Sequence, residues 1–127
     1  MSRIKGKLTK VEERGWAALK LAGIRFRKHP SGVLGKPDAG NKSKKLAIFF
    51  DSEFWHGHDW ERQRGTIKSN RKFWVKKIER NIARDKEVNR RLRKQGWTVI
   101  RIWERDLTPS RLEKTVRKLK SRFSNIH

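Results

Sequence analysis

The chain has 127 residues, of which 35 are lysine or arginine and 13 are acidic, giving a formal net charge of +22. This length suits one domain with one modest core, and the six tryptophans and six phenylalanines exclude a typical disordered chain, which is poor in aromatic residues. The lack of cysteine excludes disulfides, thiolate zinc sites and a thiol nucleophile.

The first third of the chain predicts a helix, a short strand and a loop. Residues 9–23 carry an apolar stripe at helical spacing, and Thr9 and Glu12 have the spacing of a capping box. Residues 24–28 alternate as a short strand does. The glycines and prolines of residues 29–45 predict a turn-rich loop.

The middle of the chain predicts a buried strand and then a long helix. The sequence LAIFF at 46–50 is a continuous apolar run, which is typical of a strand buried on both faces. Residues 61–68 indicate a polar loop. Residues 69–95 repeat apolar side chains at helical spacing, and Gly96 marks the end of that helix.

The last third of the chain predicts a second strand and a final helix. Residues 97–104 are rich in β-branched and aromatic side chains, which favour a strand. Thr108 and Pro109 suit the N-cap and the first residue of a helix. The order of elements predicts one α/β domain, residues 1–127, with a central sheet flanked by helices.

The excess of positive charge predicts a polyanionic partner, because each neutralised phosphate releases condensed counterions. Residues 1–8 are basic and are expected to form a flexible arm. The sequence has no lipidation motif and no long apolar run, which argues against a membrane surface. Its N-terminus lacks the apolar core of a signal peptide, so a cytoplasmic location beside the nucleoid is expected.

Two aspartates are candidates for a metal site. Asp38 follows Pro37 at the end of a loop and Asp51 follows the buried strand, and functional groups gather at such strand ends in α/β sheets. Two carboxylates suit Mg²⁺, which prefers oxygen ligands and stabilises charge developing on a phosphate. His56 or His58 is then a candidate acceptor for the proton of the nucleophile. Because Pro-Asp is a common turn pair, a structural role for Asp38 stays open.

His56 and His58 also resemble half of a zinc site. The only further histidines, His29 and His127, are remote from them in the sequence. Without cysteine, a closed structural zinc site is not expected.

Four aromatic residues flank the polar candidates: Phe54, Trp55, Trp60 and Trp74. One interpretation assigns them to the core, because aromatic side chains carry the largest apolar burial. The other interpretation makes them a wedge or a stacking platform for bases, as in minor-groove and base-flipping proteins. Both interpretations stay open at this point.

Four sequence blocks occur in a fixed order: GKPD, FFDSEFWHGH, KFWVKKIERNIARD and LRKQGWTVIRIWE. Together these blocks resemble the very short patch repair (Vsr) endonucleases, and the likeness covers residues 9–107. The resemblance implies a restriction-endonuclease-like fold, in which a central mixed sheet is flanked by helices.

The resemblance also implies roles for single residues. Asp38 matches the Pro-Asp acid that binds Mg²⁺, Asp51 matches a second position close to Mg²⁺, and His56 matches the proposed general base. Glu12 matches an acid of the N-terminal helix that helps the active site, although the capping box is an alternative explanation. The aromatic residues that wedge into mismatched DNA match Phe54, Trp55 and Trp74. A helix motif without an assigned role matches Asn81, Arg84 and Asp85.

Two features depart from the family pattern. The zinc site of the family is built mostly from cysteines, and the matching positions here hold Glu53, His58, Trp60 and Arg105, so loss of the zinc is expected. Glu53 follows two residues after Asp51, so both side chains share a face if the strand continues, and Glu53 becomes a candidate metal ligand and catalytic acid. Ala-Gly-Asn follows Asp38 where relatives have a β-branched strand, which predicts a frayed sheet there.

Charge and resemblance together predict an endonuclease that hydrolyses a phosphodiester in double-stranded DNA with Mg²⁺ or Mn²⁺. Its target is expected to be a mismatch or a specific site, in a repair, restriction or homing role. The alternatives are a non-catalytic basic nucleic-acid-binding module and an RNA-associated basic protein. The loop lysines are candidate phosphate contacts: Lys36, Lys42, Lys44 and Lys45.

Overall fold

The fold is that of a computed structural model, which describes the backbone of residues 2–124 and the side chains of residues 10–124. The helices are α1 (Ser2–Leu21), α2 (Trp60–Gln63), α3 (Arg71–Lys94) and α4 (Pro109–Ser124). Two 3-10 turns follow α2 and β4, namely η1 (Arg64–Thr66) and η2 (Glu104–Leu107). The strands are β1 (Arg27–Lys28), β2 (Ala39–Asn41), β3 (Leu46–Asp51) and β4 (Thr98–Trp103).

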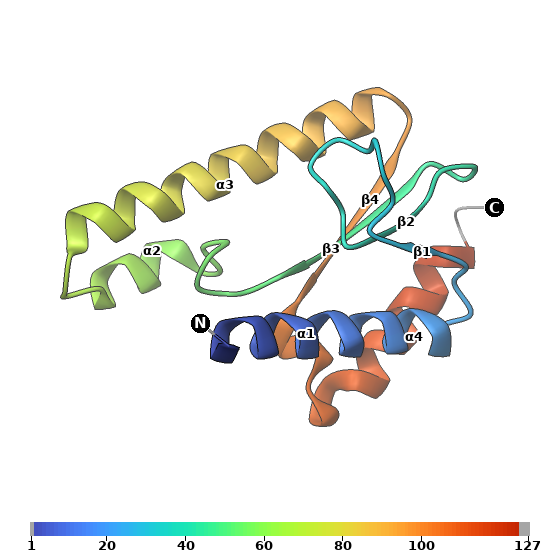
Figure 1. Ribbon diagram of the computed structural model, residues 1–127, viewed down its shortest axis with the longest axis horizontal. Helices are drawn as coiled ribbons and strands as arrows, with labels where there is room; N and C mark the ends of the chain where they lie inside the picture. Colours follow the sequence, from blue (N-terminus) through green and yellow to red (C-terminus); the bar gives the residue numbers. More distant parts are fainter. Residues whose placement is uncertain (1, 125–127) are drawn as a thin grey trace.

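A mixed four-stranded sheet forms the centre of the protein, with the strand order β1-β2-β3-β4. Strand β2 is antiparallel to both β1 and β3, whereas β3 and β4 are parallel. Helix α3 covers one face of this sheet, and α1 and α4 cover the other (Figure 1). The predicted α/β class, a restriction-endonuclease-like central mixed sheet flanked by helices, is confirmed.

Strand β3 is buried along its whole length, as its apolar sequence predicts. Because side chains alternate across a strand, Ile48 and Phe50 join the core beneath α1 and α4. Ala47 and Phe49 point the other way and join the core beneath α3. Asp51 ends the strand, and the same alternation directs its side chain to the α3 side.

Helix α3 is longer than the sheet it covers. Its 24 residues span about 36 Å, whereas the six residues of β3 span about 20 Å. Val88 and Leu92 in its second half are buried, but Phe73 near its start is 57 % exposed. The beginning of α3 therefore extends past the sheet, and helical spacing alone did not distinguish this part from the buried part (Figure 1). Within residues 2–124, no helix combines the length and the apolar character needed to cross a membrane.

Helix α1 begins at Ser2, earlier than the predicted start at Thr9. A capping box requires its first residue to precede the helix. Thr9 lies inside α1, so the capping-box explanation of Glu12 is wrong. The basic stretch that was expected to form an arm is helical from Ser2 onward. The predicted stop is confirmed, because the N–H of Gly23 donates back to the carbonyl of Lys20 at 3.0 Å.

Strand β2 forms where a loop and a frayed sheet were predicted. Gly40 of β2 lies opposite Ala47 of β3. A β-carbon at Gly40 would lie 2.8 Å from the carbonyl oxygen of Leu46, so glycine permits the close approach that this pairing requires. Pairing with a strongly apolar neighbour thus outweighs the weak strand propensity of Ala-Gly-Asn. The predicted loop at 61–68 is also wrong in part, since it contains most of α2 and all of η1.

Candidate active site at the carboxyl end of strand β3

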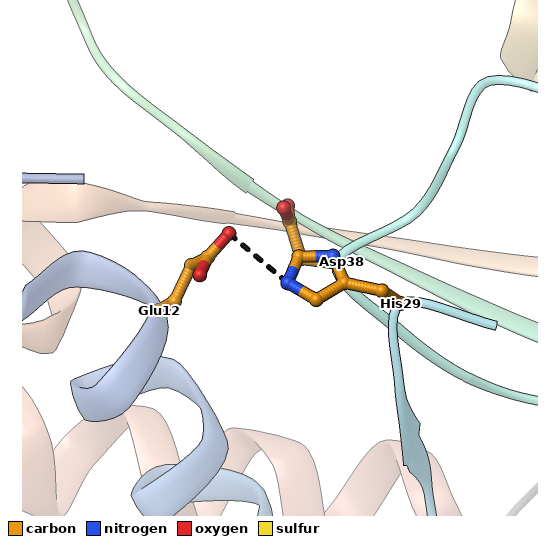
Figure 2. Close-up of side chains that lie close together, drawn as sticks. All are labelled: Glu12, His29 and Asp38. Atoms are coloured by element: carbon orange, nitrogen blue, oxygen red, sulfur yellow. Dashed lines mark ion pairs between the residues drawn. The ribbon is translucent and has the colours of Figure 1, made fainter. Parts of the chain in front are cut away.

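Three side chains from separate elements meet beside the sheet. Glu12 lies on α1, His29 follows β1, and Asp38 precedes β2. One ligand atom from each lies within 4.8 Å of the other two, and Nε2 of His29 is 3.4 Å from Oε1 of Glu12 (Figure 2). We call these three residues the Asp38 group. Two carboxylates and an imidazole at this spacing form a donor set for a divalent cation.

Bonds to one carbonyl hold the Asp38 group together. The N–H of His29 and the indole N–H of Trp16 both donate to the backbone oxygen of Asp38, each at 3.1 Å. The Trp16 ring also meets the His29 ring edge-on, with centroids 5.5 Å apart. His29 has a φ of 45°, which is uncommon for a residue other than glycine. The contacts with Trp16 and Asp38 stabilise this conformation and keep the imidazole beside Glu12.

The side chain of Asp38 is fixed by the sheet. Its Oδ2 accepts the backbone N–H of Phe50 at 2.8 Å. Burial is the largest effect on the pKa of the Asp38 carboxyl and raises it. The hydrogen bond from Phe50 lowers this pKa and the nearby charge of Glu12 raises it, so the pKa lies above its ordinary value. A carboxylate has about four lone-pair sites, so one accepted bond leaves capacity for a cation.

A second group of ligand-type side chains lies where β3 ends. It consists of Asp51, His56 and Asp85, whose ligand atoms also lie within 4.8 Å of one another. We call these residues the Asp51 group. Nδ1 of His56 is 2.5 Å from Oδ2 of Asp85 and 3.7 Å from Oδ1 of Asp51. Arg101 of β4 completes the arrangement, since its Nη1 donates to both oxygens of Asp51 at 3.0 and 3.1 Å.

The charges in the Asp51 group alter its pKa values. Burial is the largest effect on His56 and lowers its pKa, but the bond to Asp85 and the charges of Asp51 and Asp85 together outweigh burial. The pKa of His56 is therefore raised. Burial raises the pKa of Asp51, and the positive charges of Arg101 and His56 offset this rise only in part.

Gly57 lets the loop after β3 approach α3. It has a φ of 65°, and a β-carbon there would collide with the side chain of Ile82. The side-chain amide of Asn81 donates to the carbonyl of Trp55 at 3.0 Å and fastens the same loop to the helix. These contacts bring the intervening His56 alongside α3.

Glu53 belongs to neither group. Strand β3 ends at Asp51, so the alternation that would keep Asp51 and Glu53 on one face does not continue. Oε1 of Glu53 instead accepts the backbone N–H of Arg105 at 2.7 Å. Its Oε2 is buried without a hydrogen-bond partner in the described part of the chain. Glu53 thus joins the loop after β3 to the turn after β4.

The other positions that match the zinc ligands of the family also have local partners. The ring of His58 packs edge-on against Trp103, with centroids 4.7 Å apart. The indole N–H of Trp60 donates to Oε2 of Glu79 on α3 at 3.1 Å. Within residues 10–124, His58 is in neither group of candidate metal ligands.

The aromatic residues form a cluster on the surface, made of Phe54, Trp55, Phe73 and Trp74. Trp74 is central to the cluster, with its ring 5.1 to 5.7 Å from the other three by centroid distance. Phe54 and Trp55 are 38 % and 39 % exposed, so the core interpretation is wrong for them. Nζ of Lys77 lies 5.4 Å from the centroid of the Trp55 ring. The cluster and Lys77 together form an apolar and partly cationic surface, and Trp55 directly precedes His56 of the Asp51 group.

The four loop lysines lie in different places. Lys36 is exposed just before Asp38. Lys44 and Lys45 precede β3, and the length of the strand separates them from Asp51 by about 20 Å. A cavity of about 690 Å³ is lined in part by Arg25, Arg27, Lys28, His29 and Lys42. Of the four lysines, Lys42 thus shares a cavity with a member of the Asp38 group.

Three residues of these sites did not stand out in the sequence. His29 is remote from His56 and His58 in the sequence, but the fold brings it to Asp38. Arg101 has no motif signal of its own, although an arginine within an apolar strand sequence, V-I-R-I, could have been noted as a buried charge in need of a partner. Phe73 precedes Trp74 and is one of the apolar residues at helical spacing, with no role predicted for it. Asp85 was part of a recognised motif, but no role was assigned to it.

Comparison with known proteins identifies related chains. The family described as DNA mismatch endonuclease Vsr matches residues 1–62. The Type II nicking enzyme V.NmeDIP of Neisseria meningitidis serogroup C is 49 % identical over 107 residues, which is 84 % of this chain and 72 % of that protein. The Type II nicking enzyme V.HpaIIP of Haemophilus parainfluenzae is 48 % identical over 67 % of this chain and 60 % of its own length. The DNA mismatch endonuclease Vsr of Escherichia coli is 31 % identical over 76 % and 61 %.

Proposed function

Because the chain belongs to the Vsr family of DNA endonucleases, we propose that it nicks double-stranded DNA by hydrolysing a phosphodiester bond with the help of a divalent cation. The observation that carries this proposal is the His56–Asp85 pair, with 2.5 Å between Nδ1 and Oδ2, together with a separate set of cation ligands whose Asp38 is hydrogen-bonded to Phe50, the residue before Asp51. A general base and a bound divalent cation are the two groups that metal-assisted hydrolysis of a phosphodiester uses.

The Asp38 group is the proposed cation site. Its donors are two carboxylates and one imidazole from Glu12, Asp38 and His29, and this set fits Mg²⁺ or Mn²⁺. When bound, the cation would supply stabilisation of the negative charge that develops on the phosphate. The chain contributes the orientation, since the sheet holds Asp38 through Phe50 and the Trp16 contacts hold His29.

His56 is the proposed general base. Its Nδ1 is engaged by Asp85, so the proton belongs on Nδ1 and Nε2 carries the lone pair. Nε2 can then take the proton of the attacking water. Asp85 stabilises the imidazolium that results and keeps the ring in one orientation. Asp51 adds a second negative charge 3.7 Å from Nδ1, and its other contacts fix it in place.

The proposed DNA path runs along the beginning of α3, which extends past the sheet. Its exposed cations are Arg71, Lys72, Lys76, Lys77, Arg80 and Arg84. The aromatic cluster lies beside them, and exposed aromatic rings next to cations suit stacking on or wedging into base steps. We propose that the target is a mismatched or readily deformed site, in DNA of the nucleoid within the cytoplasm. The relatives named as nicking and mismatch enzymes support this choice.

A nicking assay tests the proposal. Supercoiled plasmid and matched or G·T-mismatched duplexes would be incubated with the full chain, with and without Mg²⁺ or Mn²⁺. We expect metal-dependent nicking that is lost in Asp38→Ala and in His56→Ala, with Asp59→Asn as an exposed control. Salt-dependent DNA binding without cleavage under every condition would instead establish the alternative, a non-catalytic basic nucleic-acid-binding module.

A further inference from the structure

Arg101 lies inside a set of side chains that would otherwise suit a metal ion. The Asp51 group offers two carboxylates and an imidazole, as the Asp38 group does. Within residues 10–124, however, a guanidinium is paired with the carboxylates of the Asp51 group and none is paired with those of the Asp38 group. Nη1 of Arg101 is nearly equidistant from the two oxygens of Asp51, at 3.0 and 3.1 Å, and is 3.6 Å from Oδ1 of Asp85. A nitrogen on the bisector of a carboxylate occupies the direction from which a bidentate cation would bind.

The position of Arg101 is fixed by more than these carboxylates. Its Nε donates to Oδ1 of Asn89 on α3 at 2.8 Å. Its guanidinium lies over the Phe49 ring, 4.1 Å from the centroid, which is a favourable cation–π distance. The side chain is only 18 % exposed. Bonds to β3 and α3, together with packing on the Phe49 ring of β3, make withdrawal of this cation costly.

Charge balance explains why a cation is needed there. The side chain of Asp51 is 5 % exposed and that of Asp85 is 20 % exposed, so two carboxylates share a poorly solvated space. Unpaired buried charges are strongly unfavourable. Arginine stays protonated at all relevant pH values, so its charge does not depend on metal supply.

We propose that Arg101 is a resident cation that takes the place of a second divalent metal ion in the Asp51 group. The chain then binds one divalent cation, at the Asp38 group, and Arg101 holds Asp51 and Asp85 in position around His56. Arg101 is thus a positioning residue, which acts on the reaction through His56. The positioning role rests on the proposed nuclease function, whereas the exclusion of a second metal ion does not.

Counting bound Mn²⁺ on the DNA-free protein tests the exclusion directly. The full chain, Arg101→Met and Arg101→Lys would be titrated with Mn²⁺ by calorimetry and by electron paramagnetic resonance. Methionine removes the charge at similar volume, and we expect Arg101→Met to bind one Mn²⁺ more per chain than the wild type. Lysine retains a charge, so Arg101→Lys should bind the same number as the wild type. An unchanged count in folded Arg101→Met would overturn the proposal.

A second variant covers the case in which Arg101→Met does not fold. Asp51→Asn in the wild-type background should leave the number of bound Mn²⁺ ions unchanged, because Asp51 holds arginine and not metal. Loss of a bound Mn²⁺ in Asp51→Asn would refute the proposal.

The same experiments separate this inference from the proposed function. If the wild type binds no Mn²⁺ and does not nick DNA, the proposed function fails, but a gain of one ion in Arg101→Met still supports the resident cation. If the wild type nicks DNA, Arg101→Met should lower kcat on the order of 100-fold, the scale of a general base, with little change in KM, and Arg101→Lys should recover part of that loss. An equal kcat in Arg101→Met would refute the positioning role.

Discussion

The imidazole of His56 and the carboxylate of Asp85 lie 2.5 Å apart, measured from Nδ1 to Oδ2, although 29 residues separate them in the chain. The loop after β3 supplies the histidine and α3 supplies the aspartate. This pair sets both the orientation and the raised pKa of the proposed base, and it leads to the first prediction.

Asp85→Asn should move the acid limb of the pH–rate profile to lower pH. The base works only when His56 is neutral, so the nicking rate rises as the pH passes the pKa of His56. Asp85 helps to raise that pKa, and its removal lowers it. The maximal rate should also fall, on the order of 10²- to 10⁴-fold, because the imidazole loses its orienting partner. Single-turnover nicking measured across pH checks this, and Asp59→Asn, an exposed aspartate, should leave the profile in place.

Asp38→Asn should abolish cation binding and yet raise the melting temperature of the metal-free protein at neutral pH. Burial raises the folded-state pKa of Asp38, so its contribution to stability is present at low pH and is lost as the pH rises through the folded-state pKa. Asparagine carries no charge and still offers an oxygen to the N–H of Phe50. Calorimetry in a chelator at neutral and acid pH checks this, and the gain should disappear at acid pH. A lower melting temperature at neutral pH would contradict the pKa shift.

His29→Asn should weaken Mn²⁺ binding more than Mg²⁺ binding. An imidazole donor favours transition metals over Mg²⁺, which prefers oxygen ligands. We expect the ratio of the Mn²⁺ affinity to the Mg²⁺ affinity to fall roughly ten- to a hundredfold. The loss of even a hydrogen-bond partner of a metal ligand has an effect of this size. Titration calorimetry with each ion gives the ratio. His58→Asn is the matched control, and an equal effect there would remove the case for His29.

Trp55→Ala should weaken binding to a mismatched or deformed duplex while hardly changing the fold. Stacking of one base on an aromatic ring contributes about 1–3 kcal/mol, so affinity should fall about 5- to 150-fold. Because the ring is 39 % exposed, its loss should destabilise the protein less than Ile78→Ala, which removes a buried side chain at a cost of roughly 2–5 kcal/mol. Fluorescence anisotropy on matched and G·T-mismatched duplexes, together with melting curves, separates the two effects. A large loss of stability with unchanged DNA preference would favour a packing role.

Much of the fold could be predicted because the signals are local. The apolar run at 46–50 and the β-branched residues of 97–104 formed the parallel strands β3 and β4, and the 3.6-residue spacing marked α3. Strand β2 and the start of α1 could not be predicted in this way. Ala-Gly-Asn is a strand only because β3 lies next to it, and α1 continues through Thr9 despite a local pattern that favours a cap.

The residues of the candidate site also divide into those that the sequence predicted and those that it did not. Glu12, Asp38, Asp51 and His56 were predicted from the family resemblance, which depends on residue types at fixed spacing. His29, Phe73 and Arg101 were not assigned, because their roles depend on neighbours that are distant in the chain. Asp51 and Arg101, for example, are 50 residues apart. Glu53 is the opposite case. Its spacing from Asp51 predicted that both side chains share a strand face, but the strand ends at Asp51.

The sequence by itself determined that this is a basic α/β domain with a buried strand that presents Asp51 at its end, since length, charge and side-chain periodicity are properties of the chain alone. Only the tertiary structure decided how the carboxylates are shared between two groups. Parallel pairing of β3 with β4 puts Arg101 beside Asp51, and the return of the chain after β1 puts His29 beside Asp38. Contacts of this kind arise from strand register and helix packing, which no local pattern encodes.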